Sequence, residues 1–144
     1  METVLVDTCV WYALFDSRDQ YYARAYEEAE LFELLTVVVP WPTAYETLRT
    51  KFVRKSYELQ QFERFLKRPN VEFISDEPFR ESAFNISLET SLRRGRPLSM
   101  VDCLIRTILD DLDTKINYLA TFNRSDFIDV CVSNRVALLF DEIP

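Results

Sequence analysis

The chain has 144 residues, of which 24 are acidic and 17 are basic, so its formal net charge is -7. This length suits one domain with a single core, and we expect one domain over residues 1–144. The acidic balance argues against broad nonspecific adhesion to nucleic acid, although local basic patches can still guide a phosphate backbone. Histidine is absent, which excludes Ser-His-Asp and Cys-His catalysis and the usual histidine-bearing zinc sites.

The three cysteines Cys9, Cys103 and Cys131 are far apart and form no C-x-x-C pair. Neither a disulfide framework nor a thiolate metal site is expected, so we interpret them as reduced thiols. No basic leader precedes the first apolar run, and no apolar run reaches membrane-spanning length. These features predict a cytoplasmic protein without contact to a membrane.

The chain opens with the apolar run Val4-Leu5-Val6, which stops abruptly at Asp7-Thr8. Such a run without polar alternation predicts a strand that is covered on both faces, as in the centre of a parallel sheet. Asp7 would then lie at the carboxyl end of this strand, where ligands of α/β sheets bind. An ordinary helix cap by Asp7 or Thr8 explains the same residues, so both interpretations stay open here. Residues 9–15 suit a short helix that packs back on the sheet.

A helix is predicted over residues 21–34, followed by a second strand over residues 35–39. The apolar stripe of the helix comprises Tyr22, Ala25, Tyr26, Ala29 and Phe32. Pro40 and Pro42 end the strand, and a further helix follows at residues 43–55. Its inward side is predicted to comprise Tyr45, Leu48 and Phe52. Glu46 lies in its first turn, where it either complements the helix dipole or adds a second acid at a strand end.

A helix over residues 57–67 and a third strand at Val71–Ile74 come next. The helix is predicted to turn Phe62, Phe65 and Leu66 inward. Another helix opens at residues 76–78, and its shared face comprises Phe79, Ala83, Ile86 and Thr90. It ends in a basic loop at residues 93–97, where three arginines surround the only glycine. Gly95 is free to adopt the left-handed conformation that closes a helix.

Residues 98–112 carry the clearest helical periodicity. The predicted stripe comprises Val101, Leu104, Ile105, Ile108, Leu109 and Leu112. Ser99 and Asp102 form the S-x-x-D signal of a helix start. Asp102 is therefore either part of a capping box or a third acid beside the edge of the sheet.

A fourth strand is predicted at residues 118–121, and a polar turn at residues 122–127 contains Asp126. Residues 136–140 form a fifth strand, and residues 141–144 form a short acidic tail. Because strands alternate with helices, we expect an α/β fold in which a parallel sheet lies between two helical layers.

Four acids, Asp7, Glu46, Asp102 and Asp126, follow strand ends or open the core helix. A doubly wound sheet can bring all of them to one rim. Carboxylates held together repel each other unless cations lie between them, and oxygen ligands suit Mg²⁺ or Mn²⁺. Such ions activate water and stabilise charge on a phosphodiester without histidine or a covalent nucleophile. The acids therefore favour a metal-dependent phosphodiesterase.

Four segments resemble, in the right order, the motifs of the PIN-domain nucleases and especially of the small VapC-type toxins of prokaryotic toxin–antitoxin systems. These segments are Val4-Leu5-Val6-Asp7-Thr8, Thr43-Ala44-Tyr45-Glu46, Gly95-Arg96-Pro97-Leu98-Ser99-Met100-Val101-Asp102 and Thr121-Phe122-Asn123-Arg124-Ser125-Asp126-Phe127. The resemblance implies a three-layer α/β/α sandwich with a central five-stranded parallel sheet. It also implies metal-dependent RNA cleavage that leaves a 3′-hydroxyl, an antitoxin that occupies the active-site groove, and frequent homodimers.

On this resemblance, the four acids are the predicted catalytic residues and metal ligands, with Asp126 acting directly or through water. Residues predicted to orient these carboxylates or bound water are Thr8, Ser99 and Asn123. Residues predicted to meet RNA phosphates are Arg93, Arg94, Arg96 and Arg124. The chain departs from the family pattern at Cys9, where Asn is common, and at Asn123, where some members carry an acid.

Two other functions stay open. The departures at Cys9 and Asn123 and the acidic surface also suit a PIN-like binding module whose catalysis is impaired. A phosphoacceptor or phosphatase domain would likewise place Asp7 at a strand end, but the chain lacks the D-x-D pair and an acidic doublet beside the first strand.

Overall fold

Five parallel strands form one sheet in the computed structural model, which describes residues 1–140. The strands are β1 (Thr3–Val6), β2 (Thr36–Pro40), β3 (Val71–Ile74), β4 (Tyr118–Ala120) and β5 (Ala137–Leu139). Their order is β3-β2-β1-β4-β5. Strands β2 and β3 are therefore added on one side of β1, and β4 and β5 are added on its other side. The predicted α/β/α sandwich with a five-stranded parallel sheet is confirmed. The predicted acidic tail lies outside the described residues.

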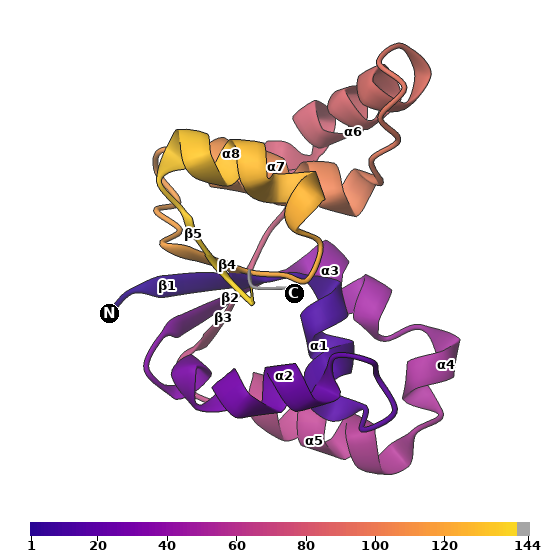
Figure 1. The fold of residues 1–144 in the computed structure, drawn as a ribbon, viewed down its shortest axis with the longest axis vertical. Helices are drawn as coiled ribbons and strands as arrows, with labels where there is room; N and C mark the ends of the chain where they lie inside the picture. Colours follow the sequence, from indigo (N-terminus) through magenta and orange to yellow (C-terminus); the bar gives the residue numbers. More distant parts are fainter. Residues whose placement is uncertain (141–144) are drawn as a thin grey trace.

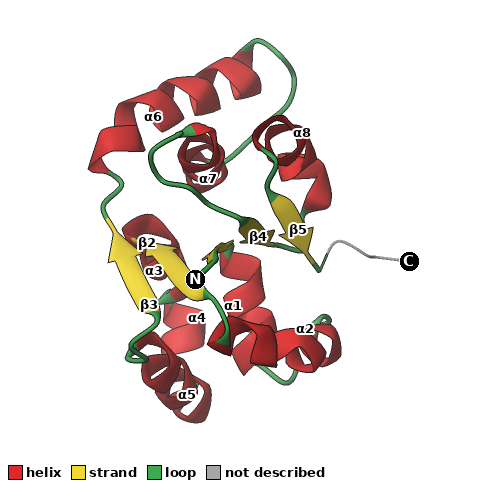
Figure 2. Cartoon of the chain, turned by 90° about the vertical axis from the view of Figure 1, so that its left-hand side faces the viewer, coloured by secondary structure: helices red, strands yellow, loops and turns green. Residues whose placement is uncertain are grey.

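The first helical layer covers the sheet with α1, α2 and α5, and the second with α6, α7 and α8 (Figure 1, Figure 2). The helices before β3 are α1 (Thr8–Phe15), α2 (Tyr22–Glu28), the 3₁₀ helix η1 (Ala29–Glu33), α3 (Trp41–Thr47), α4 (Thr50–Val53) and α5 (Ser56–Leu66). The later helices are α6 (Glu77–Leu92), α7 (Met100–Asp110) and α8 (Arg124–Asn134). Each layer therefore comes from one continuous part of the chain.

Strand β1 separates two hydrophobic cores. Its residues Val4 and Val6 face the core of α1 and α5, whereas Leu5 faces the core of α7 and α8. All three side chains are fully buried. Successive strand residues point to opposite faces, so an apolar run without polar alternation is what a doubly covered strand requires. This confirms the interpretation of the opening stretch.

The predicted single helix at residues 21–34 is wrong in its second half. The α-helix ends at Glu28, and the tighter η1 continues to Glu33. Phe32 is fully buried as expected, but Tyr26 is largely exposed. A stripe of constant period does not describe residues 29–33, because the helical period changes after Glu28. Tyr26 lies before this change, in a short helix whose buried residue is Ala25.

The predicted helix at residues 43–55 is broken into α3 and α4. The hydroxyl of Tyr12 donates to the main-chain carbonyls of Glu46 at 2.8 Å and Thr47 at 3.1 Å. Carbonyls at the end of a helix need such partners, and Tyr12 supplies one from α1. Tyr45 and Leu48 are exposed rather than inward, although Phe52 is buried as predicted.

The buried side of α3 consists of two threonines and an alanine instead of aromatic residues. Thr43 Oγ1 donates to the carbonyl of Pro40, and Thr47 Oγ1 donates to the carbonyl of Thr43, both at 2.7 Å. Because both hydroxyls are hydrogen-bonded, their burial leaves no polar group without a partner. The small side chains of Thr43, Ala44 and Thr47 also let α3 approach β2 and α1 closely.

The core helix α7 and the segment after β4 also differ from expectation. Helix α7 ends at Asp110, and Leu112 is 85% exposed instead of belonging to the buried stripe. The predicted polar turn at residues 122–127 is wrong from Arg124 onward, where α8 begins, and only Phe122 and Asn123 lie outside the helix. Its buried side chains Phe127, Val130 and Cys131 recur at helical spacing, so the signal for this helix was present in the sequence.

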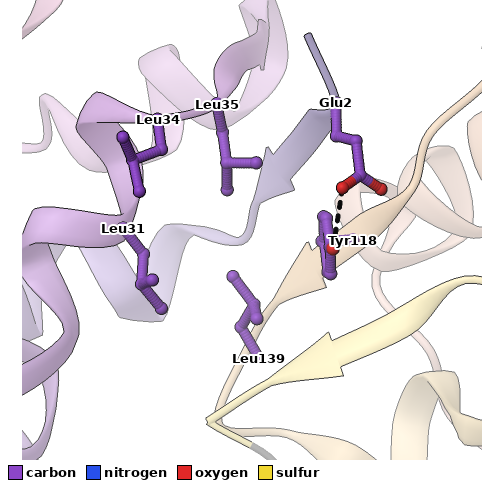
Figure 3. Close-up of a pocket in the computed structure, with 6 residues that line it drawn as sticks. All are labelled: Glu2, Leu31, Leu34, Leu35, Tyr118 and Leu139. Atoms are coloured by element: carbon purple, nitrogen blue, oxygen red, sulfur yellow. Dashed lines mark hydrogen bonds between the residues drawn. The ribbon is translucent and has the colours of Figure 1, made fainter.

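An apolar pocket of about 290 Å³ lies between η1 and strands β4 and β5 (Figure 3). Glu2 and Tyr118, whose side chains form a 3.2 Å hydrogen bond there, precede or begin strands at their amino ends. The pocket therefore does not belong to the rim that carries the four acids. Within residues 1–140, none of the helices combines the length and apolar character needed to cross a membrane.

Candidate active site

The four predicted acids come from four segments at the carboxyl edge of the sheet. Asp7 directly follows β1, and Glu46 lies in α3 after β2. Asp102 and Asp126 lie in the first turns of α7 and α8. The chain reverses its direction across the sheet between β1 and β4, and crevices at such switch points are where α/β proteins bind ligands.

Asp7 is almost completely buried, and three hydrogen bonds hold its carboxylate in place. Its Oδ1 accepts the main-chain N–H of Thr8 at 2.8 Å, so the predicted cap contact exists. Its Oδ2 accepts the hydroxyl of Thr121 at 2.8 Å and the thiol of Cys9 at 3.4 Å. Burial raises the pKa of Asp7, and the nearby charge of Glu46 adds to this increase, while the three hydrogen bonds oppose it.

Asp102 stands at the start of α7, where its main-chain N–H donates to Ser99 Oγ at 3.1 Å. This confirms the predicted S-x-x-D helix start. Partial burial and then the charge of Asp7 raise the pKa of Asp102 to about 6, and the charges of Asp126 and Glu46 contribute further. The carboxylates of Asp7, Glu46 and Asp126 therefore lie within electrostatic reach of Asp102. The helix-cap contacts predicted for Asp7 and for Ser99 with Asp102 are both present.

The start of α8 is anchored by two arginines. Arg106 Nη1 donates to the main-chain carbonyl of Asp126 at 2.8 Å. The terminal nitrogens Nη1 and Nη2 of Arg106 also donate to the two carboxylate oxygens of Asp129, each at 2.7 Å. Arg96 donates to the carbonyl of Ser125 at 3.0 Å. Sequence reasoning missed Arg106, although it follows Asp102 by four residues and so shares a face of α7 with it.

Cys9 and Asn123 are in contact with each other. The amide of Asn123 donates to Cys9 Sγ at 3.8 Å, and the main-chain N–H of Asn123 donates to Thr121 Oγ1 at 3.0 Å. Burial and the charge of Asp7 raise the pKa of the Cys9 thiol far above its ordinary value. The thiol therefore stays protonated and serves as a hydrogen-bond donor to Asp7, not as a nucleophile. The sequence places Thr121 in the fourth motif but does not predict its hydrogen bond to Asp7.

The residues at the rim fit a hard divalent cation in their chemistry. The hydroxyl of Thr8 is buried beside Asp7 and has no hydrogen-bond partner within residues 1–140. Such an orphaned oxygen suits a bound ion or its water. In the same part of the chain, no three acidic or thiol side chains lie close enough together to hold a metal ion between them. Mg²⁺ commonly keeps several waters and takes only one or two protein carboxylates, so an open rim of acids is compatible with it.

Comparison with known protein families gives a match to the PIN domain over residues 4–132. The chain belongs to the PIN-domain family. The resemblance predicted from the four motifs is thereby confirmed, and the match contains all four acids. Proteins of this family are in general nucleases that need divalent metal ions. A search of curated proteins finds no significant match.

Among solved structures, this PIN domain is similar to a chain in the crystal structure of VapBC2 from Rickettsia felis bound to a DNA fragment from their promoter. The alignment has a TM-score of 0.57 and 17% sequence identity, and it covers 95% of this chain and 97% of the other. At this identity the likeness concerns the fold, and it shows that the two chains correspond over nearly their whole length.

The predicted phosphate-binding arginines of the PIN domain lie on or near the loop after α6 and at the start of α8. Arg93 and Arg94 pair with Glu89 at 2.8 Å and 3.9 Å, and Arg96 pairs with Asp129 at 3.7 Å. Arg124 is the first residue of α8. Any phosphate that binds to Arg93, Arg94 or Arg96 must therefore compete with a neighbouring carboxylate.

Proposed function

We propose that this PIN domain is a metal-dependent endoribonuclease and the toxin of a toxin–antitoxin pair. One observation carries the proposal: Asp7, Glu46, Asp102 and Asp126 come from four separate segments at the carboxyl edge of the sheet, and the charges of the other three help to raise the pKa of Asp102. Such repulsion lowers stability unless a cation is bound, which makes it typical of a functional site. RNA as the substrate follows from the likeness to VapC-type toxins.

In this proposal Asp7, Glu46 and Asp102 hold Mg²⁺ or Mn²⁺, and Asp126 holds it directly or through water. The ion, when bound, activates water and stabilises the charge that develops on the phosphate. Thr121, Cys9 and the N–H of Thr8 fix the two oxygens of Asp7. Thr8 and Ser99 orient carboxylates or bound water, and Asn123 holds the Cys9 thiol that points to Asp7. The orphaned hydroxyl of Thr8 is the clearest support for such a role.

The reaction forms a bond between the water oxygen and phosphorus and breaks the bond to the ribose 3′-oxygen. The 3′-oxygen leaves and takes up a proton, which gives a 3′-hydroxyl. Residues proposed to contact the substrate's phosphates are Arg93, Arg94, Arg96 and Arg124. They lie in or next to the segments that carry Asp102 and Asp126, which is the support for this assignment.

The partner we propose is a protein antitoxin that occupies the groove at the acid rim, since the structural neighbour is a VapBC complex with DNA. We further propose a homodimer and a cytoplasmic location, both of which agree with VapC-type toxins. Exposed apolar residues on α6, which include Phe84 and Leu92, provide surface for protein contacts.

A second candidate is a PIN-like binding module without catalysis. It is favoured by Cys9, which replaces the Asn common in the family, and by Asn123, which does not supply the anionic oxygen that some family members carry there. In such a module the acids would serve the architecture of the rim alone. Carboxylate-dependent cation binding separates the two candidates, since only the nuclease needs it.

The test measures cleavage of a single-stranded RNA with Mn²⁺, with EDTA, and with the variants Asp7→Asn and Asp102→Asn. The control is Asp113→Asn, which removes an exposed acid outside the rim. We expect cleavage only with Mn²⁺, a loss of at least about a hundredfold in both rim variants, and no change in the control. Calorimetric titration with Mn²⁺ follows the ion directly. Cleavage that persists in EDTA and in both rim variants would rule out the proposal.

A further inference from the structure

A basic pocket of about 480 Å³ lies beside the acid rim, between α1, the loop after it, and α4. We define the basic pocket by the side chains that carry its chemistry, which are Tyr12, Arg18, Arg49, Lys51, Phe52 and Lys55. We propose that it binds single-stranded RNA next to the cleaved bond, with a phosphate on its cations and a base stacked on Arg49. This inference rests on the proposed nuclease function and adds a substrate site that the four motifs do not contain.

The basic pocket is directly connected to the acid rim. Its residue Tyr12 donates a hydrogen bond to the main-chain carbonyl of Glu46 at 2.8 Å. Arg49 follows Glu46 by three residues and lies in the break between α3 and α4. A strand of RNA with a phosphate at the rim therefore reaches the pocket within its next nucleotides.

The lining of the pocket has four cations against two acids, Asp16 and Asp19, so its positive charges are in excess. Lys55 is paired with Asp16, and the carboxylate of Asp19 accepts the main-chain N–H of Tyr21 at 2.9 Å. Neither Arg49 nor Lys51 has an ion pair with any residue of the range 1–140. The same is true of Arg18, so in a protein of net charge -7 the pocket holds three cations without an ion pair in that range, a local exception that attracts a phosphate.

The geometry of Arg49 adds a flat surface to this charge. Its guanidinium carbon lies 4.7 Å from the ring centroid of Tyr12, in cation–π contact. The residue is exposed, so the face of the guanidinium that is turned away from Tyr12 is open to solvent. Arginine planes and aromatic rings are the platforms on which proteins stack unpaired RNA bases. A rigid double helix does not offer a free base, so the pocket selects single strands.

RNA uses more of these features than an acidic peptide does. A peptide carboxylate would engage Lys51 and Arg49 by charge, but it would leave the stacked Arg49 and Tyr12 pair without a role. The position beside Glu46 also matches a substrate that must continue past the rim, whereas a peptide ligand has no such requirement. We therefore assign the pocket to single-stranded RNA, and an acidic peptide becomes an outcome of the test.

The experiment measures binding of a fluorescent ten-nucleotide RNA by anisotropy in EDTA, where cleavage is not required. The variants are Arg49→Gln, Arg49→Lys and Lys51→Gln. The control Arg64→Gln makes the same charge change on the exposed side of α5. We expect about tenfold weaker binding for Arg49→Gln and Lys51→Gln, and no change for the control. Arg49→Lys keeps the charge but loses the planar guanidinium group. The increase in log Kd for Arg49→Lys should therefore be more than half of the increase for Arg49→Gln.

Three results would overturn the inference: wild-type protein that does not bind the RNA, pocket variants that bind like the control, or displacement of the RNA by a ten-residue polyglutamate at equal concentration. Thermal melting checks that the variants are folded. Cleavage with Mn²⁺ is measured separately, and there the pocket variants should raise KM with little change in kcat. If the RNA binds through Arg49 while no cleavage occurs, the nuclease proposal fails and the binding site stands.

Discussion

The side-chain amide of Asn123 donates to the thiol of Cys9 across 3.8 Å, although 114 residues separate them in the chain. Cys9 donates in turn to Oδ2 of Asp7 at 3.4 Å. The two positions that depart from the family's motifs thus form one hydrogen-bonded path to the first acid. In this chain the two side chains are therefore compatible with each other, and Cys9 serves as a hydrogen-bond donor to Asp7.

The first prediction concerns the donor at position 9. Cys9→Ala removes one hydrogen bond to Asp7 and leaves its carboxylate less well oriented. Partners of this kind typically contribute about tenfold or more to metal affinity. We expect Cys9→Ala to weaken Mn²⁺ binding by about tenfold in calorimetry. Cys9→Ser restores a donor and should bind Mn²⁺ within about threefold of the unchanged protein. Equal affinities in all three proteins would show that Cys9 does not position Asp7.

The second prediction concerns repulsion at the acid rim. The pKa of Asp102 is raised from 3.8 to about 6 in the folded chain, so its charged form lowers stability above pH 6. Asp102→Asn should therefore raise the free energy of unfolding in EDTA at pH 8. After allowance for solvent screening of this half-buried group, we expect about 1 kcal/mol.

The sign of this effect depends on pH. As the pH falls through 6 toward 4, Asp102 becomes protonated in the folded state and its penalty disappears. The advantage of Asp102→Asn should therefore shrink over this interval, as measured by urea denaturation at several pH values. Added Mn²⁺ should raise the melting temperature of the unchanged protein more than that of the variant. A variant that is less stable than the unchanged protein at pH 8 would contradict the assigned repulsion.

The third prediction concerns Arg106, which holds the start of α8. Arg106→Gln removes its bonds to the carbonyl of Asp126 and to Asp129. We expect kcat for RNA cleavage to fall about tenfold with little change in KM, because Asp126 loses its fixed position. Arg106→Lys should not restore kcat, since an ammonium cannot reproduce the planar two-pronged contact. A change in KM alone would indicate a direct role in RNA binding.

The Arg106 and Asp129 pair also links stability to pH. The hydrogen bonds from Arg106 hold the pKa of Asp129 well below its ordinary value. Stability from this pair is present above the pKa of Asp129 in the unfolded chain and is lost as the pH falls below it. Because Asp129 is about half exposed, a double-mutant cycle of Arg106→Gln and Asp129→Asn should give less than about 1 kcal/mol at neutral pH.

The fourth prediction concerns Tyr12 and the break between α3 and α4. Tyr12→Phe keeps the ring beneath Arg49 but removes the donor to the carbonyls of Glu46 and Thr47. We expect the free energy of unfolding to fall by about 1 kcal/mol in urea denaturation. Binding of the RNA in EDTA should change little, because the pocket keeps its cations and its plane. A loss of RNA binding equal to that of Arg49→Gln would show that the hydroxyl itself contacts RNA.

The strands and the four acids were predictable from local sequence. Apolar runs such as Val71–Ile74 read directly as strands, and the order of the acids matched a known family. The sequence pattern does not predict helix α8, because the polar residues Asn123, Arg124 and Ser125 are typical of a turn. The helical spacing of Phe127 and Val130, which are buried, is the weaker signal that indicates the helix. Leu112 was assigned to the core because the periodic stripe continues past the residue at which α7 ends.

By itself, the sequence determined the five strands, the α/β class and the identity of the acids, because burial on both faces of a sheet requires uninterrupted apolar runs and strand ends follow from them. Only the tertiary structure shows that Tyr12 bonds the last carbonyls of α3, that Asn123 donates to Cys9, and that Arg106 donates to the carbonyl of Asp126. These contacts are hydrogen bonds between residues 20 or more positions apart, and no local periodicity records them. The contact of Tyr12 with Glu46 also joins the basic pocket to the acid rim.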